Sequence, residues 1–246
     1  MILYGDMDIS TIHEMPANRI PIKNCVIKSS KRPTAYQFIE KELQHGHQAY
    51  VICHLIEESE DSEYENVISY HEKLCAFFQN KYHIEILHGK MSADQKESIM
   101  TSYSKHEIDI LVSTTVIEVG IDVPNSTVIL IEDAQAFGLS QLHQLRGRVG
   151  RSNLQSYCIM IDSSKGKEEN PRLQICNHSN DGFEIAEKDL DLRGPGDFFG
   201  IRQSGEMSFS LGDIYQDASI LQDVSEDVQL YLQMPSNKSE IFLNSL

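Results

Sequence analysis

The feature that most constrains the fold is a series of short apolar runs in the middle of the chain. Residues 49–53 form a continuous apolar run, which is typical of a strand buried on both faces. Further strands are predicted at residues 84–87, 108–113, 128–132 and 157–161. Because helical segments separate these strands over residues 49–162, the sequence predicts a doubly wound α/β domain with a mostly parallel sheet.

The polar residues that follow these strands are candidates for chemistry. Ligands of doubly wound sheets bind in the crevice outside the carboxyl ends of the strands. The polar side chains expected at that edge are His54, His88, Thr114, Thr115 and Asp133.

The segments between the strands carry helix signals. Pro33 marks the start of one helix, and Ser92 with Gln95 forms a capping box for another. The acidic stretch 57–65 is too charged for a core and predicts an exposed loop, which precedes a helix over about residues 66–80.

Charge and cysteine content limit the classes of function. The formal net charge of −16 argues against a broad basic surface for nucleic acid, so any DNA contact must be local or made mainly by parts of the protein outside this chain. Five scattered cysteines without a CxxC pair argue against a zinc site or a disulfide framework and fit a reducing cytosol. No apolar run is long enough for a membrane span, and the chain is expected to be cytoplasmic.

Residues 144–151 (QLRGRVGR) are the first candidate site. On a helix, Gln144, Arg148 and Arg151 share one face, and the glycines between them favour a turn. The apolar residues Leu142, Leu145 and Val149 would pack inward on the opposite face. Two guanidinium groups suit a phosphate because arginine stays charged and binds oxyanions bidentately. The alternative is a solvated basic helix end.

Residues 113–124 (STTVIEVGIDVP) are the second candidate site. Hydroxyl groups at the end of a buried strand can bind a phosphate backbone, and Gly120 permits a close approach. Asp122 offers a carboxylate to a ribose hydroxyl. The alternative is a Thr-capped helix followed by a Gly/Pro turn.

The C-terminal third predicts a helical hairpin. Helices are expected at residues 171–178 and 181–192, the second capped by Asn180 or Asp181. Its inward stripe is expected to be Phe183, Ala186 and Leu190. The loop 193–205 holds four glycines and a proline and cannot continue either helix.

Together these stretches resemble known helicases. Residues 113–124 and 144–151 resemble motifs V and VI of superfamily two helicases, and residues 49–56 and 87–91 fall where motifs IV and IVa would. The stretches that resemble the RecG family of branched-DNA translocases are residues 3–10, 55–59, 131–143, 180–200 and 203–205. The resemblance covers nearly the whole chain and thins after about residue 223.

The resemblance implies a RecA-like P-loop NTPase lobe with a mostly parallel sheet, followed by a helical hairpin and loop. The expected parts are a linker from a missing first lobe (1–30), the second RecA-like lobe (31–162), the hairpin and translocation loop (163–206) and an acidic helical tail (207–246). The chain contains no GxxxxGK[ST] phosphate loop. ATP and Mg²⁺ would therefore be bound mainly by the missing lobe, and this chain alone would not hydrolyse ATP.

Individual roles follow from the same resemblance. Arg151 would be the arginine finger and Arg148 a second γ-phosphate contact, supported by Gln144. Gly120 and Asp122 would lie near the ribose. The residues expected to touch the DNA backbone are Thr114, His88 and Lys90, and those expected to couple ATP hydrolysis to movement are Arg172, Arg193 and Gln203.

The implied function is that of the C-terminal part of a bacterial, nucleoid-associated, ATP-dependent helicase. It would remodel branched double-stranded DNA, namely stalled forks and Holliday junctions. His54, Ser152 and the acidic tail depart from the family pattern without touching the expected ATP contacts. The alternatives are a translocase like the transcription-repair coupling factor Mfd, which residues 3–10 and 55–59 disfavour, and a non-catalytic RecA-like interaction module. The intact pair Arg148 and Arg151 argues against the module.

Overall fold

The computed structural model describes residues 20–53, 60–114, 122–166 and 169–193, together with the single residues 224 and 228. Within these ranges, residues 60–66, 190 and 193 are described by their backbone alone. Almost all described residues belong to one compact unit, Met15–Leu192.

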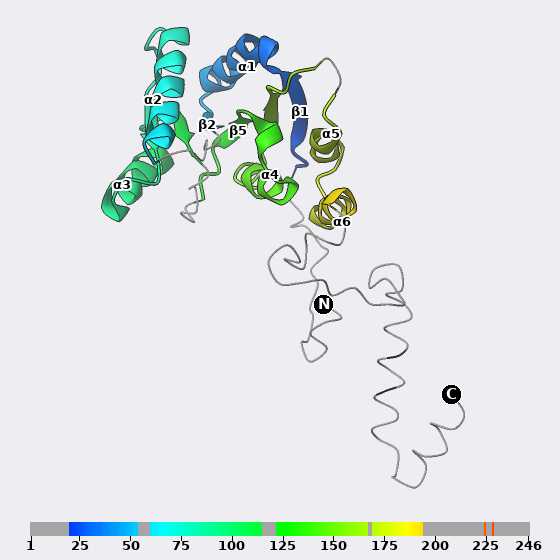
Figure 1. Ribbon diagram of the computed structural model, residues 1–246. Coiled ribbons are helices and arrows are strands. Elements are labelled where there is room, and N and C mark those ends of the chain that lie inside the picture. Colours follow the sequence, from blue (N-terminus) through cyan, green and yellow to red (C-terminus); the bar gives the residue numbers. More distant parts are fainter. Residues whose placement is uncertain are drawn as a thin grey trace, which may run out of the picture. The chain divides into compact units, whose positions relative to one another are not determined.

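A parallel sheet forms the centre of this unit (Figure 1). Its strands are β1 (Lys23–Lys28), β2 (Gln48–Ile52), β3 (Ile84–Leu87), β4 (Ile110–Ser113), β5 (Ser126–Ile131) and β6 (Tyr157–Asp162). They lie in the order β1-β6-β5-β2-β4-β3, and every pair among the described residues is parallel. The predicted α/β fold class is confirmed. The predicted strands are all present, with ends shifted by one or two residues.

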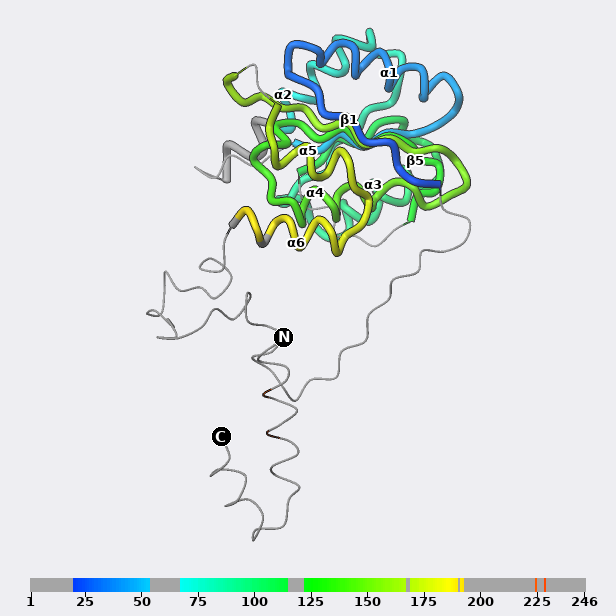
Figure 2. The backbone as a smooth tube through the Cα atoms, turned by 90° about the vertical axis from the view of Figure 1, so that its right-hand side faces the viewer, coloured from blue at the N-terminus to red at the C-terminus, as the bar shows by residue number. Residues whose placement is uncertain are grey.

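Helices cover both faces of the sheet. They are α1 (Arg32–Gln44), α2 (Glu60–Phe77), α3 (Ala93–Ser104), α4 (Leu139–Arg146), α5 (Pro171–His178) and α6 (Gly182–Arg193), with short 3-10 turns at Ser29–Lys31 and Ala134–Ala136. Apolar residues of α1 and α2 pack on one face, and those of α3 to α6 pack on the other. Figures 1 and 2 show α1 on one side of the sheet and α4 on the opposite side.

Each face of the sheet has its own core because successive side chains of a strand point to opposite sides. Tyr50 of β2 packs into the core under α3 and α4, and its neighbour Val51 packs into the core under α1 and α2. All five residues of β2 are therefore buried. This explains the continuous apolar run in the sequence.

The acidic stretch 57–65 is not wholly a loop, because α2 already begins at Glu60. Glutamate is a good helix former, and acidic side chains in a first turn are favoured by the helix dipole. Charge density therefore did not exclude helix there. Residues 54–59, which include His54, lie outside the described residues.

The predicted inward stripe of α6 is wrong at Phe183 and Ala186, and the side chain of its third residue, Leu190, lies outside the described part of the structure. Phe183 is 52% exposed and Ala186 is exposed, whereas Ile185 and Asp189 are buried. The cause is Gly182, against which the ring of His143 lies directly. Positions 182, 185 and 189 share one helix face, so contact at the glycine turns that face inward.

The end of the expected linker 1–30 contains β1, an edge strand that pairs with β6 in the sheet. Residues 194–205 of the expected loop 193–205 and almost all of the tail 207–246 lie outside the described residues. Across the described parts of the chain, no helix has both the length and the apolar composition required to span a membrane.

Candidate functional site

The arginine motif leaves the helix earlier than the helical projection predicted. Helix α4 ends at Arg146 with Gly147 as its C-cap. The backbone NH of Arg148 donates to the carbonyl of Leu145 (3.0 Å), so a tight turn follows. The shared helix face for Arg148 and Arg151 is therefore wrong, while the glycine-induced turn is right. The side chains of Leu142, Leu145 and Val149 are buried, as predicted.

Arg151 and Arg148 differ in what holds them. The Nε of Arg151 donates to the carbonyl of Gly147 (3.0 Å), and its Nη1 lies 3.5 Å from Oδ1 of Asp122. Arg148 is half-buried, and its side chain makes no hydrogen bond or ion pair with the described residues. Gln144 is exposed, and Gly120 lies outside the described residues. The turn thus presents two cations with few competing partners.

Tyr50 lies behind this arginine pair. Burial raises the pKa of the Tyr50 phenol, and the positive charges of Arg151 and Arg148 act in the opposite direction. Both guanidinium groups are therefore within electrostatic range of one buried hydroxyl. A partly buried pair of cations near a low-dielectric core suits an anion with several charges.

A second polar group forms at the carboxyl ends of β3 and β4. Leu87 is in register with Ser113, which places the next residues, His88 and Thr114, side by side, and both are buried. The Oγ1 of Thr114 is buried with no hydrogen-bond partner among the described residues. Because a buried hydroxyl ordinarily has a partner, this atom is a candidate ligand contact.

The loop after β3 is fixed by a residue that the sequence analysis missed. The Nζ of Lys96, on α3, donates to the carbonyl of Gly89 (2.9 Å). Lys90 next to it is exposed. The position of Lys96 could have pointed to this contact, because Lys96 lies one turn after the N-cap Ser92 of α3 and the first turn of the helix lies next to the preceding loop.

A buried ion pair at the same edge of the sheet was also missed. Arg32 of α1 donates to both carboxylate oxygens of Glu132 at 2.9 Å, and the hydroxyl of Tyr36 donates to the same carboxylate (3.2 Å). Burial raises the pKa of Glu132 despite these bonds, which act to lower it. The cluster links the end of β5 to α1, and the polar groups of its three side chains are used in hydrogen bonds with one another.

The expected coupling residues are only partly described. The Nη2 of Arg172, in the first turn of α5, donates to the carbonyl of Phe137 (3.2 Å), so it joins the hairpin to the start of α4. Arg193 is the last residue of α6, and the structure describes its backbone but not its side chain. Gln203 lies outside the described residues.

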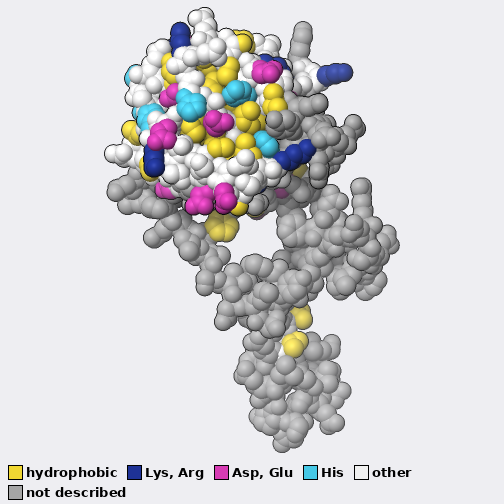
Figure 3. Space-filling model, turned by 90° about the vertical axis from the view of Figure 1, so that its left-hand side faces the viewer, with side chains coloured by type: hydrophobic (Ala, Val, Ile, Leu, Met, Phe, Trp, Pro, Cys, Tyr) yellow, Lys and Arg dark blue, Asp and Glu magenta, His cyan; other side chains and the backbone are white. Residues whose placement is uncertain are grey.

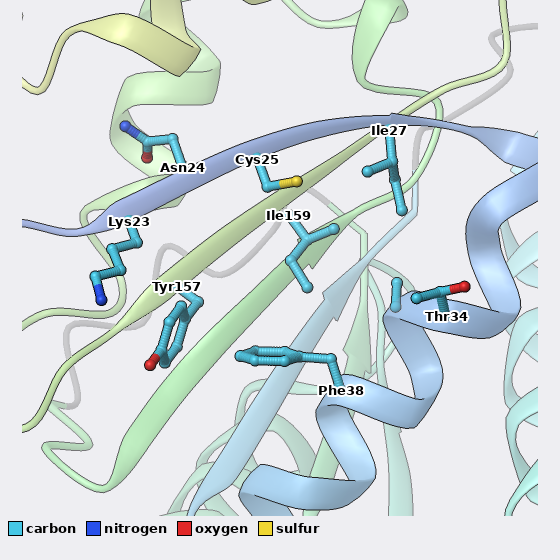
Figure 4. Close-up of a pocket in the computed structure, with 9 residues that line it drawn as sticks. Lys23, Asn24, Cys25, Ile27, Thr34, Phe38, Tyr157 and Ile159 are labelled. Carbon is cyan, nitrogen blue, oxygen red and sulfur yellow. The ribbon is translucent and has the colours of Figure 1, made fainter.

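Apolar side chains also gather on one face of this unit and around one pocket. Figure 3 shows the side on which α2 and α3 lie, where hydrophobic side chains gather at the centre and lysines and arginines are scattered around the rim. An apolar pocket of about 230 Å³ lies between β1 and α1 and is lined by Cys25, Phe38, Tyr157 and Ile159, among others (Figure 4). The described residues also contain no group of three or more metal-binding side chains.

Comparison with known proteins places the chain in a family. The family "Helicase conserved C-terminal domain" matches residues 30–153, and the family "ATP-dependent DNA helicase RecG, domain 3, C-terminal" matches residues 179–239. The ATP-dependent DNA helicase RecG of Bacillus subtilis is 47% identical over 92% of this chain, and that of Staphylococcus epidermidis is 47% identical over 94%.

The chain spans about a third of the length of these relatives (33% and 34%). A solved structure of RecG bound to a three-way DNA junction is also similar, with 38% identity and a TM-score of 0.69 over 89% of this chain and 28% of that one. These matches and the six-stranded parallel lobe lead to one conclusion: the chain belongs to the RecG family of ATP-dependent DNA helicases and corresponds to their C-terminal part.

Proposed function

We propose that the chain is the second motor lobe and hairpin of an ATP-dependent helicase that remodels stalled forks and Holliday junctions. ATP binds between this lobe and a first lobe that supplies the phosphate loop, and Mg²⁺ is bound mainly by that first lobe. The present chain by itself does not hydrolyse ATP. The relative solved on a three-way DNA junction supports branched DNA as the partner.

The observation that carries the proposal is the state of the arginine pair. The side chain of Arg148 makes no hydrogen bond or ion pair with the described residues, and Arg151 is held by Asp122, whose side chain is 52% exposed. Arg151 acts as the arginine finger and Arg148 as a second γ-phosphate contact, with Gln144 in support. Such a finger contributes ~10³–10⁵ in rate by stabilising charge in phosphoryl transfer.

The remaining expected residues have three further roles. Gly120 and Asp122 contact the nucleotide near its ribose. Thr114, His88 and Lys90 contact the DNA backbone at the ends of β3 and β4, a contact that carries charge but no sequence information. Arg172, Arg193 and Gln203 couple ATP hydrolysis to movement along duplex DNA.

The test is ATP hydrolysis by the full-length protein with and without fork DNA. The Arg151→Ala variant should lose turnover by at least ~10³-fold and still bind the fork. Gln203→Ala should hydrolyse ATP but fail to separate strands. Lys188→Gln is the control, because Lys188 is an exposed side chain of α6 whose one ion pair among the described residues is with Glu184. Normal hydrolysis by Arg151→Ala would show that the arginine pair is structural and would refute the proposal.

A further inference from the structure

Arg146 lies within the arginine motif but points away from it. It is the last residue of α4, and only 3% of it is exposed. Its Nη1 donates to the carbonyls of Cys176 (3.0 Å) and Ser179 (2.7 Å). Its guanidinium group forms no ion pair with a carboxylate of any described residue. A charge buried this deeply costs several kcal/mol unless its environment compensates it, so its position calls for an explanation.

The two carbonyls explain why the charge is tolerated. Cys176 lies in the last turn of α5, and Ser179 is its C-cap. The final carbonyls of a helix lack partners within the helix and carry the negative end of its dipole. Arg146 therefore caps α5, which binds the end of α4 to the turn between α5 and α6.

His143 extends the contact to α6. The Nη2 of Arg146 lies 2.8 Å from Nδ1 of His143. Because arginine can only donate, Nδ1 must accept and the imidazole proton must be on Nε2. A Cβ added to Gly182, the first residue of α6, would lie 2.9 Å from that Nε2. Only glycine lets the ring fit between the two helices.

Burial lowers the pKa of His143, and the adjacent charge of Arg146 lowers it further. The neutral ring that the hydrogen bond requires is therefore the form that prevails at neutral pH. Arg146, His143, the two carbonyls and Gly182 are here called the α4 clasp.

We propose that Arg146 is a positioning residue that makes α4 and the α5–α6 turn move as one body. Arg151 follows Arg146 by five positions, and the turn between them is closed by backbone hydrogen bonds at Arg148 and Val149. A displacement of the arginine pair on nucleotide binding then displaces the hairpin through the α4 clasp. This inference rests on the proposed function and adds a residue to which no role in coupling was assigned above.

Two variants of the full-length protein test the clasp. Arg146→Lys keeps the charge, but one ammonium group cannot replace a planar fork that reaches two carbonyls and His143. Gly182→Ala pushes the ring of His143 and leaves every donor in place. Lys188→Gln is the control on the same hairpin. ATP hydrolysis and strand separation of a fork are measured in one sample, with thermal melting as the check on folding.

We expect both clasp variants to keep the KM for ATP and to hydrolyse ATP within about threefold of wild type. The number of base pairs separated per ATP should fall about 2- to 30-fold, the range in which mutations along a coupled network act. A merely structural residue would lower both rates together. If Arg146→Lys melts early, Gly182→Ala carries the test alone.

Two results would count against the inference, and they are distinguishable. Wild-type protein that fails to hydrolyse ATP on fork DNA would overturn the proposed function and the clasp with it. A normal wild type with an unchanged ratio of strand separation to hydrolysis in the clasp variants would overturn only the clasp.

Discussion

Arg151 and Asp122 form an ion pair, with Nη1 of the arginine 3.5 Å from Oδ1 of the carboxylate. The two residues come from the two stretches that the sequence singled out as nucleotide contacts, and the fold brings them together without a nucleotide. Both are partly exposed, 26% and 52% for their side chains. An exposed pair of this kind contributes about 0–1 kcal/mol, so a phosphate can compete with Asp122 for Arg151.

The first prediction concerns Asp122→Asn in the full-length protein. Stability should change by no more than about 1 kcal/mol, because the pair is exposed. The KM for ATP should rise about 2- to 10-fold, the effect of one lost hydrogen bond to the ribose. The measurement compares ATP with its 2′- and 3′-deoxy analogues. The wild type should discriminate against at least one analogue, and the variant should not; equal discrimination would place Asp122 away from the ribose.

The second prediction uses two buried threonines. The Oγ1 of Thr114 has no partner among the described residues, whereas that of Thr127 donates to Glu42 (3.1 Å). Thr114→Val should leave the free energy of unfolding unchanged or higher, because it removes an unsatisfied hydroxyl. Thr127→Val should lower it by about 1 kcal/mol.

Only Thr114→Val should weaken fork DNA binding and the stimulation of ATP hydrolysis by DNA. Urea unfolding and DNA titrations of both variants provide the comparison. Equal DNA binding by Thr114→Val and wild type would remove Thr114 from the DNA contacts.

The sequence was sufficient for the sheet and for the helices with strong end signals. Apolar runs such as 49–53 arise from burial on both faces, and burial is what the fold requires there. Pro33 and the Ser92 capping box mark helix starts by local chemistry alone. These features depend on few distant contacts, so periodicity and capping were enough.

What the sequence did not reveal depends on side-chain direction after the chain has packed. Arg146 and Arg148 flank the same glycine, Gly147, in sequence, yet the guanidinium group of Arg146 donates to carbonyls at the end of α5 and that of Arg148 does not. The inward face of α6 was missed because it is set by the close approach of His143 to Gly182 rather than by the hydrophobic residues. Arg32 and Glu132 are a hundred residues apart, and no spacing rule connects them.

The third prediction is a pH dependence at Asp162. Burial acts to raise its pKa, but hydrogen bonds from Lys28 (2.8 Å) and Ser164 outweigh it, and the pKa lies below its usual value. A carboxyl whose pKa is lower in the folded state stabilises the fold above the unfolded value of about 3.9. That contribution is lost as the pH falls through the folded value.

Asp162→Asn should therefore unfold at lower urea than wild type at pH 7, and the difference should shrink below about pH 4. Asp191→Asn, at an exposed position of α6, is the control and should shift little at either pH. A difference between Asp162→Asn and wild type that persists unchanged below pH 3 would assign the loss to packing and not to the charge.

The fourth prediction separates backbone strain from crowding at two glycines with positive φ. A Cβ added to Gly46 (φ +80°) would have nothing within 4 Å, whereas at Gly150 (φ +75°) a Cβ would lie 2.8 Å from Cγ1 of Ile22. Gly46→Ala should therefore cost only the left-handed strain, about 1–2 kcal/mol. Gly150→Ala adds overpacking of about 1–3 kcal/mol.

The crowding at Gly150 should be relieved by shortening Ile22. The double variant Gly150→Ala with Ile22→Ala should lose less stability than the sum of its two single variants. The reason is that Gly150→Ala alone has the clash with Ile22, and the double variant does not. Gly46→Ala combined with Ile22→Ala should be additive, since no contact joins those sites. Additivity in both pairs would show that Ile22 and the segment before β1 move away from an added Cβ at position 150 at no cost. Ile22 would then not restrain the turn that carries Arg148 and Arg151.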